Sequence, residues 1–202
     1  MIFVRILILT LILVGATTPV SAQVLTWDFL IDEQQVKNNS DEPDGSTNSP
    51  ATGTGYFEYN TATNVISYSV SWSNLFGALT KLHVHGPATA NTSNPQHLIE
   101  IFGPPDIPNT VDLHTDVWTD SHPLLALQQP GINPMTGQPY DLLTPETILS
   151  IMESGEAYIN VHTTTFGTGE IRGNLGLPET IPEPNSLYLL LMGSAYLCFR
   201  HK

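Results

Sequence analysis

The chain has few basic residues and almost no cysteine. Lysine and arginine together number 6 among 202 residues, against 19 aspartates and glutamates, which gives a formal net charge of −13 at pH 7. Because so few cations cannot neutralise phosphates, we expect no nucleic acid partner. The single cysteine, Cys198, excludes an intrachain disulfide framework. The fold must therefore be stabilised by its core, for which a hydrophobic content of 41% is sufficient.

Several catalytic signatures are missing as well. The sequence contains no Gly-x-Ser-x-Gly motif, no P-loop and no Gly-x-Gly-x-x-Gly segment after a strand. It also lacks a cysteine nucleophile outside the C-terminal apolar run. These absences favour a binding or structural protein over an enzyme.

The first 22 residues have the composition of a secretory signal peptide. Arg5 precedes an apolar stretch over residues 6–14, and small residues end the segment at Ala22. We expect a signal peptidase to cleave between Ala22 and Gln23. A buried N-terminal helix is the alternative interpretation.

The C-terminal segment, residues 179–202, combines three parts in a fixed order. Pro182-Glu183-Pro184 is followed by a 13-residue apolar run over residues 187–199 and by a basic end with Arg200 and Lys202. The run is shorter than the ~20 residues of a spanning helix, so a simple tail anchor or a core helix is the alternative.

The order of these parts resembles the PEP-CTERM sorting signal of Gram-negative bacteria. The resemblance implies processing by an exosortase and transient anchoring in the inner membrane through the C-terminal hydrophobic helix. It further implies delivery to the cell envelope, the outer surface or the extracellular matrix.

Between the two ends, residues 23–178 have the pattern of an antiparallel β-sandwich or barrel-like domain with one short helix. Two alternating runs, residues 54–60 and 65–72, flank a short polar loop and predict a hairpin. Further strands are predicted at residues 25–31, 80–85, 97–102, 157–163 and 170–175. Short strands in this number favour a sandwich or a barrel.

One helix is predicted between Thr144 and Gly155. Thr144 is a suitable N-cap, Pro145 suits the first helical position, and Gly155 can end the helix. By contrast, seven prolines within residues 103–140 predict an irregular loop insertion.

Two of the predicted strands carry histidines that could bind a metal ion. On the first, alternation directs Leu82 and Val84 to the core and His83 and His85 to the opposite face. His162 projects from a later strand. Three imidazoles from two strands could form an open site for copper or zinc, which is one hypothesis. A pair of histidines on one strand face is more often structural, with each ring hydrogen-bonded to a neighbour.

A second candidate site lies in the proline-rich stretch. Asp112, His114, Asp116 and His122 offer oxygen and nitrogen ligands for a second ion. Their spacing matches no EF-hand or zinc-finger pattern, so a solvated acidic loop is the alternative.

Several of these segments together resemble the CHRD domain, which is named after chordin. The resemblance depends most on Leu82-His-Val-His-Gly-Pro-Ala88, Ala157-Tyr-Ile-Asn-Val-His-Thr163 and Gly169-Glu-Ile-Arg-Gly-Asn-Leu175, and it extends from about Val24 to Gly176. It implies an extracellular β-sandwich-like module that is not an enzyme. The proline-rich stretch over residues 103–140 departs from the family pattern.

The leading hypothesis is an exported, non-enzymatic binding or structural module with an extracellular protein or polysaccharide as its ligand. The alternative is a copper- or zinc-binding protein, or a metalloenzyme similar to superoxide dismutase, that uses His83, His85 and His162. Carbohydrate binding through Trp118 and Tyr140 is a third hypothesis.

Overall fold

A computed structural model of the chain describes residues 23–37, 47–103, 108, 110–124, 131–133 and 135–182. The predicted signal peptide, including Ala22, lies outside these residues, and so do Glu183, Pro184, Arg200 and Lys202 of the predicted sorting signal. Within the described ranges, no helix is long and apolar enough to cross a membrane.

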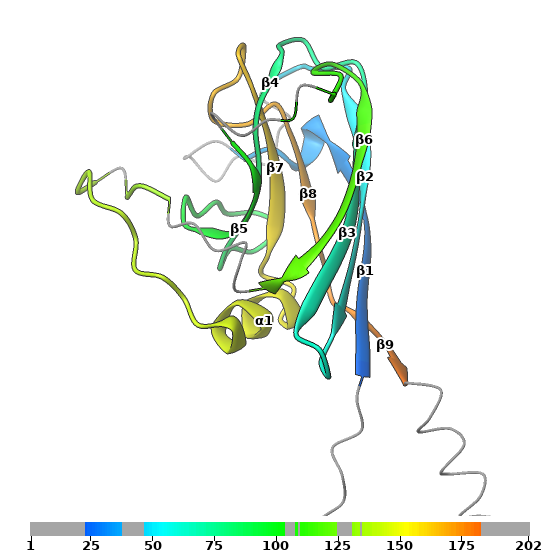
Figure 1. The fold of residues 1–202 in the computed structure, drawn as a ribbon. Coiled ribbons are helices and arrows are strands. Elements are labelled where there is room, and N and C mark those ends of the chain that lie inside the picture. Colours follow the sequence, from blue (N-terminus) through cyan, green and yellow to red (C-terminus); the bar gives the residue numbers. More distant parts are fainter. Residues whose placement is uncertain are drawn as a thin grey trace, which may run out of the picture.

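The described residues form one antiparallel sheet that curls into a half-barrel (Figure 1). Its strands are β1 (Gln23–Asp32), β2 (Thr52–Asn60), β3 (Val65–Trp72), β4 (Leu79–His85), β5 (His97–Phe102), β6 (Asp116–Pro123), β7 (Tyr158–Thr163), β8 (Ile171–Asn174) and β9 (Glu179–Pro182). Their order is β5-β4-β7-β8-β1-β2-β3-β6, and β9 pairs with β1. The predicted fold class, mostly β and barrel-like with one short helix, is confirmed.

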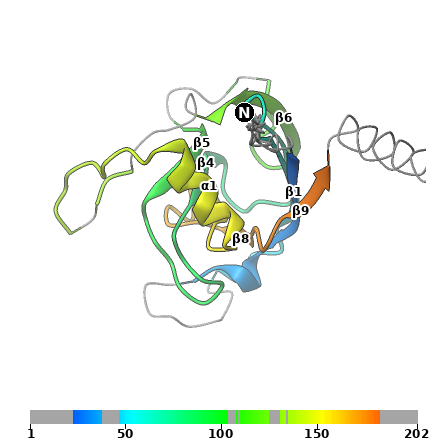
Figure 2. The same cartoon turned by 90° about the horizontal axis from the view of Figure 1, so that it is seen from below.

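The helix α1 (Pro145–Glu153) lies across one end of the half-barrel, as Figure 2 shows. It begins as predicted, since the Thr144 hydroxyl accepts a hydrogen bond from the Thr147 amide at 3.2 Å. The left-handed Gly155 (φ +74°) follows its end. The Trp27 indole of β1 donates a hydrogen bond to the Met152 carbonyl at 3.3 Å. This bond connects the end of α1 to the sheet. A single 3-10 turn, η1 (Glu33–Gln35), follows β1.

Alternation along β3 separates the core from the surface. Ile66, Tyr68, Val70 and Trp72 are buried, and the serines between them face outward. In β7 and in the second half of β4 the side chains on both faces are buried, and the apolar ones belong to the core. The strands β2 and β3 pair antiparallel, which confirms the hairpin predicted around residues 61–64.

The strand β6 corrects the prediction of an irregular loop over residues 103–140. Residues 116–123 pair with β3 along their whole length. The prediction is wrong here because β6 is the edge strand, where Pro123 at its end removes no essential ladder bond. Trp118 of β6 packs against Phe102 of β5 with ring centroids 5.9 Å apart, so side chains connect the two edges of the half-barrel.

Glu170 is a buried carboxylate that joins three segments of the chain. One oxygen accepts from the Ser49 hydroxyl at 2.6 Å and from the Phe76 amide at 2.7 Å. The other accepts from the Thr163 hydroxyl at 2.8 Å and from the Gly77 amide at 3.3 Å. The segment before β2, the β3–β4 connection and the end of β7 are therefore held together.

The strand β9 brings the two ends of the described chain together. Glu179–Pro182, which the sequence assigns to the C-terminal segment, pairs with the start of β1, and Gln23 lies opposite Pro182. Both ends lie near α1, at the same end of the half-barrel (Figures 1 and 2).

Candidate metal centre

Four histidines from three neighbouring strands lie together on the convex side of the sheet. We refer to His83, His85, His97 and His162 as the histidine cluster. His83 and His85 come from β4, His97 from β5 and His162 from β7. Because β4 lies between β5 and β7, its two histidines receive a neighbour from each side.

Alternation positions the cluster as the sequence predicts. Leu82 and Val84 are fully buried in the core, and His83 and His85 occupy the opposite face of β4. That opposite face is also covered, since His83 is 1% exposed, His85 5% and His162 7%. The imidazoles are therefore withdrawn from water although they lie outside the main core.

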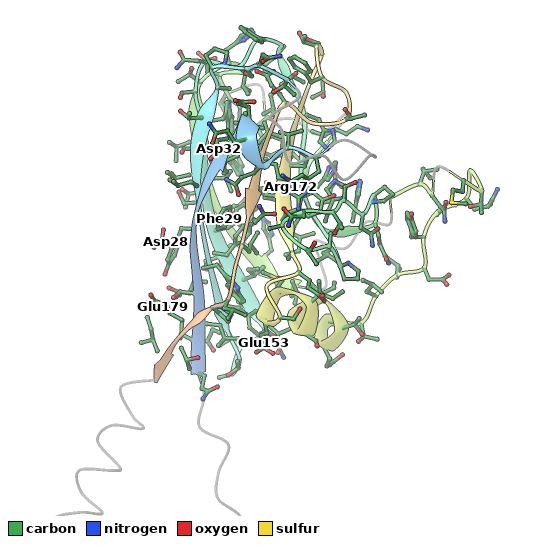
Figure 3. All side chains as sticks on the ribbon, turned by 180° about the vertical axis from the view of Figure 1, so that it is seen from behind. Asp28, Phe29, Asp32, Glu153, Arg172 and Glu179 are labelled. Atoms are coloured by element: carbon green, nitrogen blue, oxygen red, sulfur yellow. The ribbon has the colours of Figure 1, made fainter. Side chains whose placement is uncertain are left out.

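The loop between β4 and β5 covers this face of the sheet. Arg172 of β8 donates to the carbonyls of Thr89 at 3.0 Å and Thr92 at 2.7 Å, from the position labelled in Figure 3. Its guanidinium lies over the Tyr158 ring, 3.6 Å from the centroid, and the Tyr158 hydroxyl donates to the Asn94 carbonyl. Burial lowers the pKa of Arg172 to about 10.

His83 is the central ring of the cluster. Its centroid lies 3.8 Å from that of His97, 4.4 Å from that of His85 and 4.5 Å from that of His162. One nitrogen each of His83, His85 and His97 lies within 4.8 Å of the others. In a tetrahedral site, two zinc–nitrogen bonds of about 2.1 Å hold their nitrogens about 3.4 Å apart, so binding of one ion would require the rings to move closer together.

The outward nitrogen of three rings is hydrogen-bonded to an oxygen. Nδ1 of His85 lies 3.2 Å from the Gln96 carbonyl, and Nδ1 of His162 lies 2.9 Å from the Gly167 carbonyl. Nδ1 of His97 lies 2.9 Å from a Glu100 oxygen. A carbonyl or carboxylate oxygen accepts, so each Nδ1 carries a proton. In the neutral rings of His85 and His162, this leaves the lone pair on Nε2. Metal-binding histidines are oriented in this way.

The inward nitrogens have no partner. Among the described residues, Nε2 of His83, His85 and His162 is buried without a hydrogen bond, and so is Nδ1 of His83. The amide oxygen of Asn160, between His162 and Tyr158 on β7, is also unpaired. Each unpaired buried group costs about 1–3 kcal/mol, so this arrangement reduces the stability of the metal-free fold.

Burial holds His83, His85 and His162 in their neutral forms. Burial, followed by the neighbouring histidines, lowers the pKa of His83 and His85 well below the usual 6.5. Burial also lowers the pKa of His162 to about 4. At neutral pH these three rings therefore offer lone pairs without protons that a metal ion would have to displace.

The structure brings the three predicted histidines together and adds a fourth. His97 was missed because it opens a predicted strand whose alternation gave no reason to link it with the β4 pair. It is recognised only through the strand order and the register, which place it beside His85.

The residues predicted for a second ion are arranged differently. Asp112 accepts hydrogen bonds from the His114 and Thr115 amides, which lower its pKa, and Asp116 accepts from the Asp112 amide. His122 lies at the far end of β6, six residues from Asp116 and so about 20 Å away. In the described part of the chain, the one group of metal-ligand type that the structure assembles is that of His83, His85 and His97.

Comparison with known proteins connects this geometry to one family. The model of the CHRD domain matches residues 30–175, a range that contains the whole histidine cluster. No match was found among curated proteins or among solved structures.

Proposed function

This chain belongs to the CHRD family, and we propose that its domain binds a transition metal ion, copper or zinc, through the histidine cluster. One observation carries the proposal. Nitrogens of His83, His85 and His97 lie within 4.8 Å of one another, and the buried Nε2 atoms of His83, His85 and His162 have no hydrogen-bond partner among the described residues.

The donor set supports these two metals. Neutral imidazole nitrogens suit copper and zinc, whereas magnesium and calcium require oxygen ligands. The covered position of the cluster supports retention of the ion, because the Arg172-anchored loop lies over this face. A domain of this kind would capture or store metal without catalysing a reaction.

A purely structural role for the histidines does not explain the unpaired nitrogens of the cluster. The large majority of buried side-chain polar atoms in native proteins have a hydrogen-bond partner. Among the described residues, neither nitrogen of His83 has such a partner. A ligand that completes the coordination of the rings would remove this energetic cost.

The direct test is elemental analysis of the full chain, purified without chelator and without metal-affinity chromatography. We expect close to one equivalent of copper or zinc in the wild type, a loss of the ion in His83→Ala and His85→Ala, and no change in His122→Ala. A folded wild-type protein that takes up neither metal on titration would refute the proposal.

Redox assays separate a metal carrier from a metalloenzyme. We expect copper-loaded protein to show no superoxide dismutation or copper reduction beyond that of the free ion. Superoxide dismutation that is lost when the cluster is mutated would instead favour the hypothesis of a metalloenzyme similar to superoxide dismutase.

We also propose that the protein is exported and directed to the cell envelope, outer surface or extracellular matrix. The signal-peptide pattern and the resemblance of the C-terminal segment to a PEP-CTERM signal support this route, with signal peptidase and an exosortase as the processing partners. Deletion of residues 183–202, which leaves β9 intact, should shift the protein from the membrane fraction to the medium. An unchanged distribution would contradict the sorting proposal.

A further inference from the structure

Glu100 is an acidic side chain that faces two rings of the histidine cluster. Its Oε2 lies 2.9 Å from Nδ1 of His97, and its Oε1 lies 3.8 Å from Nδ1 of His83. The first contact is a charge-assisted hydrogen bond and the second is electrostatic. One carboxylate therefore acts on histidines from two different strands.

An irregular register makes this arrangement possible. On a regular strand, His97 and Glu100 are three residues apart and point to opposite faces. Here the pairing of β4 with β5 shifts twice, so that His97 lies opposite His85 and Glu100 lies opposite His83. The extra residues of β5 bring both polar side chains to the face that carries the cluster.

Given the metal binding proposed above, we propose that His97 is a ligand of the ion and that Glu100 is the positioning residue that holds it. Glu100 keeps the proton of His97 on Nδ1, which leaves the Nε2 lone pair for the ion. His97 stacks on His83 with ring centroids 3.8 Å apart, and one of its nitrogens lies within 4.8 Å of nitrogens of His83 and His85.

The exposure of the rings gives His97 a distinct place in the site. Its side chain is 18% exposed, whereas the other three rings of the cluster are almost fully buried. Its ring also packs against Gly131, where a Cβ atom would lie 3.0 Å from Nε2 of His97. His97 would therefore be the ligand nearest to solvent.

Glu100 also determines which oxidation state the site prefers. Neutral imidazoles leave a bound ion with its full charge, and one adjacent carboxylate attracts a divalent ion about twice as strongly as a monovalent one. Glu100 therefore stabilises Cu(II) or Zn(II) relative to Cu(I). The exposed Lys81, whose charge contributes to the lowered pKa of His83 and His162, acts in the opposite sense.

The test compares the full-length wild type with His97→Ala and Glu100→Gln, and uses Glu153→Gln on α1 as the control for loss of an exposed acid. Glutamine has nearly the same shape as glutamate, so we expect Glu100→Gln to fold. The test therefore still works if His97→Ala does not fold. Each protein is titrated with Zn(II) and with Cu(II) against a competing chelator. Pulsed electron paramagnetic resonance then counts the imidazoles on Cu(II), and the Cu(II)/Cu(I) midpoint potential is measured.

We expect Glu100→Gln to weaken binding of both ions by about 10- to 100-fold, to keep the number of imidazoles and to raise the Cu(II)/Cu(I) potential. We expect His97→Ala to lose one imidazole from the Cu(II) signal. If both variants match the wild type in affinity, spectrum and potential while His83→Ala loses the ion, the role of His97 and Glu100 is refuted and metal binding stands. A wild type that binds neither ion refutes both proposals.

Discussion

The imidazole of His83 stacks on that of His97, with 3.8 Å between the ring centroids and 24° between the ring planes. Two protonated rings would repel each other strongly at this separation. Burial and the neighbouring rings keep His83 neutral, and the first predictions concern what protons and metal ions do to the histidine cluster.

Acid should destabilise the metal-free domain. The pKa of His162 is about 4 in the fold, because of burial, against 6.5 in the unfolded chain, so between these values the unfolded state binds more protons. Stability should therefore be constant above about pH 6.5 and fall progressively to about pH 4, by about 3 kcal/mol for this histidine alone. His83 and His85, whose pKa values burial also lowers, act in the same direction.

Urea denaturation of metal-free protein at pH 7.5 and at pH 5 measures this effect. His162→Leu should make the difference between the two pH values smaller. Equal unfolding free energies at both pH values would show that these histidines are already protonated in the fold or accessible to water.

His83→Leu should stabilise the metal-free protein while it abolishes the stabilisation by added zinc. Leucine removes two buried, unpaired nitrogens, which cost about 1–3 kcal/mol each. Thermal unfolding without zinc measures the stability of the metal-free protein, and unfolding with zinc measures the stabilisation by the ion. His114→Leu is the matched control, because His114 uses its Nδ1 on the Leu75 carbonyl and should only lose stability. A large loss in metal-free His83→Leu would identify His83 as a structural residue.

Glu170→Ala should be among the most destabilising changes in the chain. It leaves two hydroxyls and two backbone amides without their acceptor, and hydrogen bonds to charged groups contribute about 1.5–3 kcal/mol each. We expect a loss of at least about 3 kcal/mol in urea denaturation. Glu153→Ala, on the exposed side of α1, should change the stability by less than about 0.5 kcal/mol.

Arg172→Ala should release the β4–β5 loop from the cluster. The guanidinium holds two carbonyls of that loop, at Thr89 and Thr92, and covers the Tyr158 ring. Amide hydrogen exchange should increase in residues 88–96, and bound zinc should dissociate faster. Arg172→Lys, which keeps the charge but not the forked geometry, should be intermediate. Unchanged exchange in this loop would mean that other contacts hold it.

The elements with strong local signals could be predicted from the sequence. The helix α1 has a cap, a first-turn proline and a terminal glycine, and each of them acts within a few residues. The faces of β4 also follow from local alternation, which separates Leu82 and Val84 from His83 and His85.

Features that depend on the assembled sheet could not be predicted. β6 looks like a polar loop because its outer side chains are exposed, and its partner β3 is distant in sequence. The place of His97 depends on two register shifts between β4 and β5, which no periodicity in a single strand reveals. The cover over Tyr158, which stacks on His85, depends on Arg172 and on a loop some 80 positions earlier in the chain.

The pairing of β9 with β1 has a mechanical consequence. Gln23 lies opposite Pro182, and the pairing continues antiparallel to Thr26 opposite Glu179. A force that pulls these two ends apart loads the interstrand hydrogen bonds one after another, as in unzipping, and does not shear them all at once. The strand β9 can therefore be peeled away at low force while β8 still flanks β1. Tension on the C-terminal segment would extend the chain by a few residues before it reached the half-barrel.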